Sequence, residues 1–265
     1  MKILFVDVDG TLVDYDGTVQ ESAILALKQA KKNGHMVFLC TGRNLTELRK
    51  EILDIPKDGL ICANGAFVTI GDKILHESYF DKEELREICG WLENNKIAYY
   101  LASNDALFAS ENYEEIAERY IPHLKPLHTE VLKEARKDIN KVSMILTEKK
   151  EHLLAEEKWK EYQVSPRGME GERYLFCDIR LKKVNKKEAV KMILEELKIP
   201  KGDAIAFGDG MIDIPLFEEC GSAVAMGNAY EEVKMAADYV TSDVNDDGVY
   251  AAFRYLNLIE EEQDD

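Results

Sequence analysis

The stretch ILFVDVDGTLVD, residues 3–14, places two aspartates two positions apart at the end of an apolar run. The apolar, strand-forming residues 3–6 predict a buried strand that ends near Asp7. Buried carboxylates are costly unless a partner compensates their charge, so Asp7 and Asp9 need an explanation at this position. Their partners must come from elsewhere in the chain.

Apolar runs alternate with helical patterns in both terminal parts of the chain. This βα alternation is typical of a parallel sheet whose faces are covered by helices. In such a sheet, the functional crevice lies beyond the carboxyl ends of the strands. The buried strands expected in this way are residues 2–8, 35–41, 59–65 and 204–210.

Between these two parts lies a block of about 100 residues with a different pattern. It begins with an amphipathic helix and continues as mixed strands and helices, which predicts a self-contained α+β unit. The fold class expected is therefore α/β, with a Rossmann-like parallel-sheet core at residues 1–81 and 183–265 and an inserted α+β cap domain at 82–182. The helix should bury one face made of Leu85, Ile88, Cys89 and Leu92.

Two helix starts carry capping signals. Asn44 is followed three residues later by Glu47, which resembles a capping box and predicts a helix over 44–53. Asn185 stands at an N-cap position before a second helical pattern that runs to residue 197.

The chain of 265 residues has a formal net charge of −17. A field of that sign repels nucleic acid and anionic membrane surfaces, so neither is expected as a partner. No apolar stretch approaches the ~20 residues of a membrane span, and the start lacks the apolar region of a signal peptide. The expected location is the cytoplasm. An anionic substrate would need a local cation.

Polar residues follow three of the expected strands and should meet at one edge of the sheet. Unit charges ~4 Å apart repel by ~4 kcal/mol at an effective dielectric constant of 20, so four gathered carboxylates require a cation. Oxygen ligands without histidine or cysteine select a hard ion, and Mg²⁺ is usual where phosphate completes the coordination. The residues expected at this edge are Asp7 and Asp9, Thr41 and Gly42, and Asp209 and Asp213.

Each of these signals alone has an ordinary structural explanation, such as a turn, a cap or a solvated lysine. Their order along the chain is more specific: DVDGT-LV, then TGR, then Lys186, then GDGMID. This order resembles the four motifs of the haloacid-dehalogenase-like (HAD) phosphatase superfamily. The stretches ANGA (63–66) and 224–249 resemble its Cof-type subfamily, which carries a large α/β cap.

The resemblance implies a Mg²⁺-dependent phosphoric monoester hydrolase that acts on small phosphorylated metabolites, foremost sugar phosphates, through an aspartyl-phosphate. Asp7 would be the nucleophile and Asp9 the general acid and base. Mg²⁺ would be bound by Asp7, the Asp9 backbone carbonyl, Asp209 and Asp213, and the substrate phosphate by Thr41, Gly42 and Lys186.

One position departs from the subfamily pattern. The motif GDxxND normally carries an asparagine that contacts phosphate, and this chain has Ile212 there. Two alternatives therefore stay open: phosphomutase-type transfer, and non-catalytic binding of a phosphometabolite by a partly decayed site. A dehydrogenase and a serine hydrolase are disfavoured, because no GxGxxG follows the first strand and no GxSxG occurs.

Overall fold

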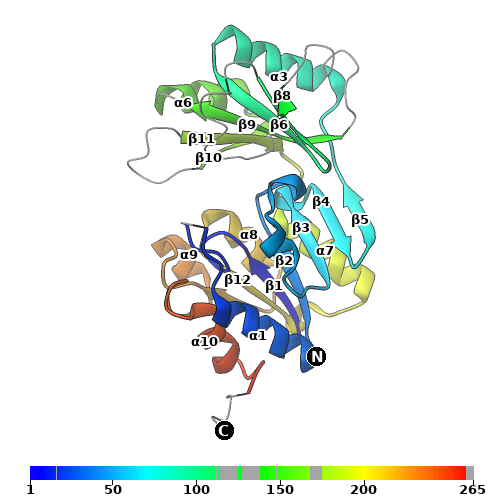
Figure 1. The fold of residues 1–265 in the computed structure, drawn as a ribbon, viewed down its shortest axis with the longest axis vertical. Coiled ribbons are helices and arrows are strands. Elements are labelled where there is room, and N and C mark those ends of the chain that lie inside the picture. The colour runs from blue at the N-terminus through cyan, green and yellow to red at the C-terminus, as the bar shows by residue number, and fades with distance from the viewer. Residues whose placement is uncertain are drawn as a thin grey trace. The chain divides into compact units, whose positions relative to one another are not determined.

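The computed structural model describes residues 1–15, 17–110, 113, 125–126, 138–146, 149–167 and 175–260. The chain forms two compact units (Figure 1). The core unit comprises Met1–Gly42, Arg49–His76 and Asn185–Asp265, and the cap unit comprises Arg43–Leu48 and Glu77–Val184.

The core unit contains an eight-stranded sheet that is parallel over six neighbouring strands. β1 lies at its centre between β2 and β12, and both pairings are parallel. The antiparallel β4 follows β3 at one side, and β5 lies beyond it. In spatial order the strands are β14 (Tyr239–Val240), β13 (Ser222–Ala225), β12 (Ala204–Gly208), β1 (Ile3–Asp7), β2 (Met36–Cys40), β3 (Gly59–Cys62), β4 (Phe67–Ile70) and β5 (Lys73–Glu77).

Helices bury both faces of this sheet, which explains why its central strands are apolar throughout. Phe5 and Ala206 pack in one cluster with Val190 of α7. The next residue along β12, Phe207, points to the other face, where its ring centroid lies 4.9 Å from that of Phe253 in α10. The helices of the core unit are α1 (Glu21–Lys32), α2 (Lys50–Leu53), α7 (Lys186–Leu197), α8 (Ile214–Glu218), α9 (Glu231–Ala236) and α10 (Gly248–Tyr255).

The cap unit contains a second, mostly antiparallel sheet of six strands. Only the short pairing between β7 and β8 is parallel among those described. The strands in spatial order are β10 (Tyr162–Arg167), β11 (Leu175–Leu181), β9 (Ile139–Leu146), β6 (Ala98–Ser103), β7 (Leu107–Ala109) and β8 (Lys125–Pro126). The fold class expected from the sequence, an α/β parallel-sheet core with a separate α+β cap, is thus confirmed.

Helix α3 (Lys82–Asn94) buries the predicted face against the cap sheet, together with α6 (Lys149–Lys158). Leu85, Ile88, Cys89 and Leu92 are its buried residues, as its spacing predicts. Asp81 caps its start by accepting hydrogen bonds from the backbone N–H groups of Glu83 and Glu84.

The segment expected as one helix over 44–53 is divided in two. The capping box of Asn44 and Glu47 is present, but it opens only a short 3₁₀ turn, η1 (Leu45–Glu47). Leu48 and Arg49 are extended before α2 begins. Contacts with the cap sheet explain the break: Thr46 Oγ1 donates to the Ser103 carbonyl at 2.9 Å, and Lys141 pairs with Glu47.

Helix α7 begins as predicted. The Asn185 side chain accepts a hydrogen bond from the Glu188 N–H at 2.9 Å. Among the described residues, no helix combines the length and the apolar character needed to cross a lipid bilayer.

Candidate active site

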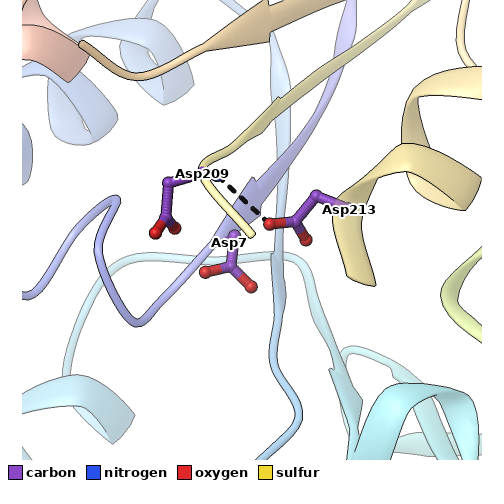
Figure 2. Close-up of side chains that lie close together, drawn as sticks. All are labelled: Asp7, Asp209 and Asp213. Atoms are coloured by element: carbon purple, nitrogen blue, oxygen red, sulfur yellow. Dashed lines mark hydrogen bonds between the residues drawn. The ribbon is translucent and has the colours of Figure 1, made fainter. Parts of the chain in front are cut away.

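Three buried carboxylates meet at the carboxyl edge of the core sheet (Figure 2). Asp7 ends β1, Asp209 follows β12, and Asp213 ends the 3₁₀ turn η5 (Met211–Asp213). Because β1 and β12 are parallel neighbours, their ends lie side by side. One oxygen from each carboxylate lies within 4.8 Å of the other two, and each residue is at most 4% exposed. We call these three residues the acidic cluster.

Lys186 supplies a positive charge to the acidic cluster from the first turn of α7. Its Nζ lies 2.5 Å from Asp7 Oδ1 and 2.5 Å from Asp213 Oδ1, and the residue is 1% exposed. Burial alone would lower the pKa of Lys186, but the charges of Asp213 and Asp7 outweigh it and hold this pKa above its usual value. Lys186 is therefore a fixed cation at the site.

Backbone amides orient Asp213. Its Oδ2 accepts hydrogen bonds from the N–H of Asp209 at 3.2 Å, drawn in Figure 2, and from the N–H of Gly210 at 3.0 Å. With Oδ1 bound to Lys186, both oxygens of Asp213 are engaged. This carboxylate thus holds the loop after β12 and the lysine in one arrangement.

The loop after β1 approaches Asp209 so closely that only glycine fits at position 10. Gly10 has a φ of +82°, and a Cβ built there would lie 2.5 Å from Asp209 Cγ. The sequence DVDGT therefore requires its glycine for two reasons, the left-handed backbone and the approach of a carboxylate.

The charge of Lys186 alone does not neutralise the acidic cluster. Burial, followed by the charge of Asp213, raises the pKa of Asp7 well above its usual range, although Lys186 opposes this. Burial and the same charge raise the pKa of Asp209 to about 6. One lysine does not balance three buried carboxylates, and all donors are oxygens. The residues fit a hard divalent cation, which would restore the ionised form of the carboxylates.

The remaining predicted residues lie along the same edge. Asp9 is half-buried in the loop after β1, and its charge adds to the raised pKa of Asp7. Thr41 is fully buried directly after β2; its N–H donates to the Ile61 carbonyl at 2.8 Å. The β1–β2 register pairs Asp7 with the residue before Thr41, and the half-buried Gly42 follows.

The structure thus joins Asp7, Lys186, Asp209 and Asp213 by direct contact or short distance. It places Asp9, Thr41 and Gly42 at the strand ends beside them.

Ile212 lies in η5 between Met211 and Asp213, and 38% of its surface is exposed. An exposed aliphatic side chain beside the acidic cluster offers no hydrogen-bond donor. The departure from GDxxND is therefore a real loss of one polar group at this edge.

Three residues without a role assigned from the sequence support Asp209 and its loop. Thr11 Oγ1 donates to Asp209 Oδ1 at 3.2 Å, and Tyr15 Oη donates to Asp209 Oδ2 at 2.5 Å. Asn228 Nδ2 donates to the Gly10 carbonyl at 2.8 Å. Thr11 and Asn228 lie inside motifs that the sequence displays, whereas nothing in the sequence points to Tyr15.

Comparison with known proteins identifies the family of this chain. The family profile described as haloacid dehalogenase-like hydrolase matches residues 4–253. The phosphatase YwpJ of Bacillus subtilis (strain 168) is 28% identical over 97% of this chain and 100% of its own length. From the same organism, the 5-amino-6-(5-phospho-D-ribitylamino)uracil phosphatase YcsE is 26% identical over 97% of this chain and 96% of its own length.

A solved structure agrees with these sequence matches. BT1666 from Bacteroides thetaiotaomicron, described among phosphatases of the HAD enzyme superfamily, aligns with a TM-score of 0.83 and 26% identity. The alignment covers 98% of this chain and 96% of that one. The chain belongs to the haloacid dehalogenase-like hydrolases, and within them it is a phosphatase.

Proposed function

We propose that the protein is a Mg²⁺-dependent phosphatase that hydrolyses small phosphorylated metabolites through an aspartyl-phosphate on Asp7. The observation that carries this proposal is the environment of the Asp7 carboxylate. It lies at a strand end, where Lys186 binds it directly and the carboxylates of Asp209 and Asp213 lie close by. Asp7 would therefore act as a nucleophile that contacts a fixed cation and belongs to a cluster able to bind a second one.

The reaction has two steps. In the first, an Asp7 carboxylate oxygen attacks phosphorus, the ester P–O bond breaks, and Asp9 gives a proton to the leaving alcohol oxygen. In the second, water attacks phosphorus and gives its proton to Asp9, while the bond between phosphorus and Asp7 breaks. Inorganic phosphate leaves, and both aspartates return to their starting states. Half-burial of Asp9 in the loop after β1 is compatible with this exchange of protons.

Asp7, Asp209 and Asp213, with the Asp9 backbone carbonyl, would hold Mg²⁺. When bound, the ion supplies charge that draws the phosphate dianion toward a carboxylate nucleophile. Lys186 favours the ionised form of Asp7 and orients it, because its Nζ contacts that carboxylate directly. The Thr41 hydroxyl and the Gly42 N–H would bind the phosphate oxygens that are not transferred.

Substrate choice is proposed to reside in the cap domain, residues 82–182, inserted into a catalytic core of residues 1–81 and 183–265. The acidic cluster and Lys186 belong to the core unit, so the groups proposed for the chemistry lie outside the cap domain. Sugar phosphates are the proposed class. The name of the relative YcsE supports this class, because the compound in that name carries a phosphorylated ribityl chain, which is derived from a sugar. The cytoplasmic location stays a prediction.

The test is release of inorganic phosphate from p-nitrophenyl phosphate and from a panel of sugar phosphates with Mg²⁺. Wild type should release phosphate, and Asp7→Asn should lose the activity. Asp54→Asn is the matched control, because the side chain of Asp54 is 66% exposed at the end of α2. Equal release by Asp7→Asn and wild type would contradict the role of Asp7.

Two further readouts separate the alternatives. An acid-quenched reaction should contain phosphate covalently bound to wild type and absent from Asp7→Asn. Analysis of the sugar products distinguishes hydrolysis from phosphotransfer, since an isomerised sugar phosphate in place of free phosphate would indicate a mutase.

A further inference from the structure

Tyr15 contacts the acidic cluster although the sequence motifs do not include it. Its hydroxyl donates a hydrogen bond of 2.5 Å to Asp209 Oδ2. The residue as a whole is 50% exposed, so it does not serve as a core aromatic. The hydroxyl group is the part of the side chain that contacts the acidic cluster.

The two oxygens of Asp209 each receive one O–H donor. Tyr15 donates to Oδ2, and Thr11 Oγ1 donates to Oδ1 at 3.2 Å. An ionised carboxylate has about four lone-pair sites, so two donors leave each oxygen able to bind a cation. At the same time, the two hydrogen bonds restrict rotation of the carboxylate of Asp209, a residue that is only 4% exposed.

A second polar side chain, that of Asn228, lies beside the Tyr15 hydroxyl. Asn228 Nδ2 donates to the Gly10 carbonyl at 2.8 Å. Asn228 Oδ1 accepts from the Val244 N–H at 2.8 Å. Asn228 is therefore fixed from two directions, close to the tyrosine that contacts Asp209.

We propose that Tyr15 is a positioning residue for Asp209, which holds this carboxylate in the orientation that binds Mg²⁺ and thereby raises the affinity of the site for the ion. The inference rests on the proposed function. Hydrogen-bond partners behind metal ligands typically change metal affinity by about 10- to 100-fold. Tyr15 acts through Asp209 and has no part in bond making or breaking.

The experiment measures Mg²⁺ binding to the full chain by titration calorimetry, with the metal alone and no substrate. Tyr15→Phe removes one oxygen and keeps the ring. We expect its Kd for Mg²⁺ to rise about 10-fold or more. Tyr255→Phe is the matched control, because the Tyr255 ring stacks on the ring of Tyr239, with their centroids 4.0 Å apart. Removal of the Tyr255 hydroxyl should leave the Kd for Mg²⁺ unchanged.

A second readout separates positioning from a general structural role. The Mg²⁺ concentration that gives half-maximal phosphatase activity should rise in Tyr15→Phe, while kcat at saturating Mg²⁺ stays near the wild-type value. The melting temperature in EDTA should match that of wild type.

Two outcomes overturn the inference. If Tyr15→Phe binds Mg²⁺ as tightly as wild type or more tightly, while wild type binds the ion and releases phosphate, the role of Tyr15 is wrong and the proposed function stands. If wild type neither binds Mg²⁺ nor releases phosphate, the proposed function is wrong and the inference falls with it.

Discussion

Lys186 Nζ lies 2.5 Å from Oδ1 of Asp7, 179 residues away along the chain, and both residues are buried. We expect Lys186→Met to lower kcat by about 100-fold or more, the scale for removing one charge-stabilising donor from an active site. Lys187→Met is the control, since this neighbouring lysine pairs with Glu218 in solvent. Steady-state kinetics at saturating Mg²⁺ measures both variants. Retention of a tenth of the wild-type kcat by Lys186→Met would contradict the assignment.

Gly10→Ala should lose both stability and metal binding. An alanine at a φ of +82° costs about 1–2 kcal/mol in backbone conformation, and the added Cβ would displace the Asp209 carboxylate. Gly34→Ala isolates the first effect, because Gly34 has a φ of +83° with open space around it. Urea unfolding should show a loss of free energy in both variants. Calorimetry should show weaker Mg²⁺ binding only in Gly10→Ala, and equal Mg²⁺ binding by the two variants would exclude the steric explanation.

Ile212→Asn should improve the enzyme. The substitution restores an amide at the position where the family motif carries asparagine, and a hydrogen bond to a charged group contributes about 1.5–3 kcal/mol. We expect kcat/KM for a phosphate monoester to rise about 10-fold or more. Met211→Asn, at the neighbouring exposed position, is the control and should leave kcat/KM unchanged. No gain from Ile212→Asn would mean that another group already fills this role.

The buried pair of Lys141 and Glu47 should contribute strongly to the stability of the cap unit. Their side chains are 0% and 8% exposed, and Tyr100 Oη also donates to Glu47. Lys141→Met leaves Glu47 buried without its cation, so we expect the free energy of unfolding to fall by about 3–5 kcal/mol. The exposed pair of Lys73 and Glu196 provides the comparison. Lys73→Met should lower the free energy of unfolding by at most about 1 kcal/mol. Urea unfolding measures both variants.

His35 should make stability depend on pH. Burial, the N-terminal ammonium and the positive charge of Lys2 lower its pKa in the folded chain, and its Nδ1 accepts the Lys2 N–H at 3.0 Å. The unfolded chain, with a histidine pKa of about 6.5, then binds the proton more readily than the folded chain. The free energy of unfolding is therefore unaffected well above pH 6.5 and decreases as the pH falls from there through the folded pKa. Between pH 7.5 and 5.5, the free energy of unfolding of His35→Gln should decrease less than that of wild type. Urea unfolding at several pH values measures both proteins, and the same dependence of this free energy on pH in both would contradict the prediction.

Local patterns in the sequence determined the architecture. The apolar run before Asp7 predicted the central strand, because only a strand buried on both faces is apolar throughout. The spacing of Leu85, Ile88, Cys89 and Leu92 predicted the buried face of α3. The gathering of Asp7, Asp209 and Asp213 was also foreseeable, because the carboxyl ends of parallel strands meet at one edge whatever their distance along the chain.

Contacts between distant side chains were decided only by the tertiary structure. The helical pattern over 44–53 is broken because Thr46 and Glu47 find partners on the cap sheet, and local propensity is weaker than buried hydrogen bonds and an ion pair. The bond from Tyr15 to Asp209 joins residues that are 194 positions apart and carry no common motif. Periodicity and strand order fix which edge a residue reaches, whereas the partner of each side chain depends on rotamers and packing that form only when the whole chain is folded.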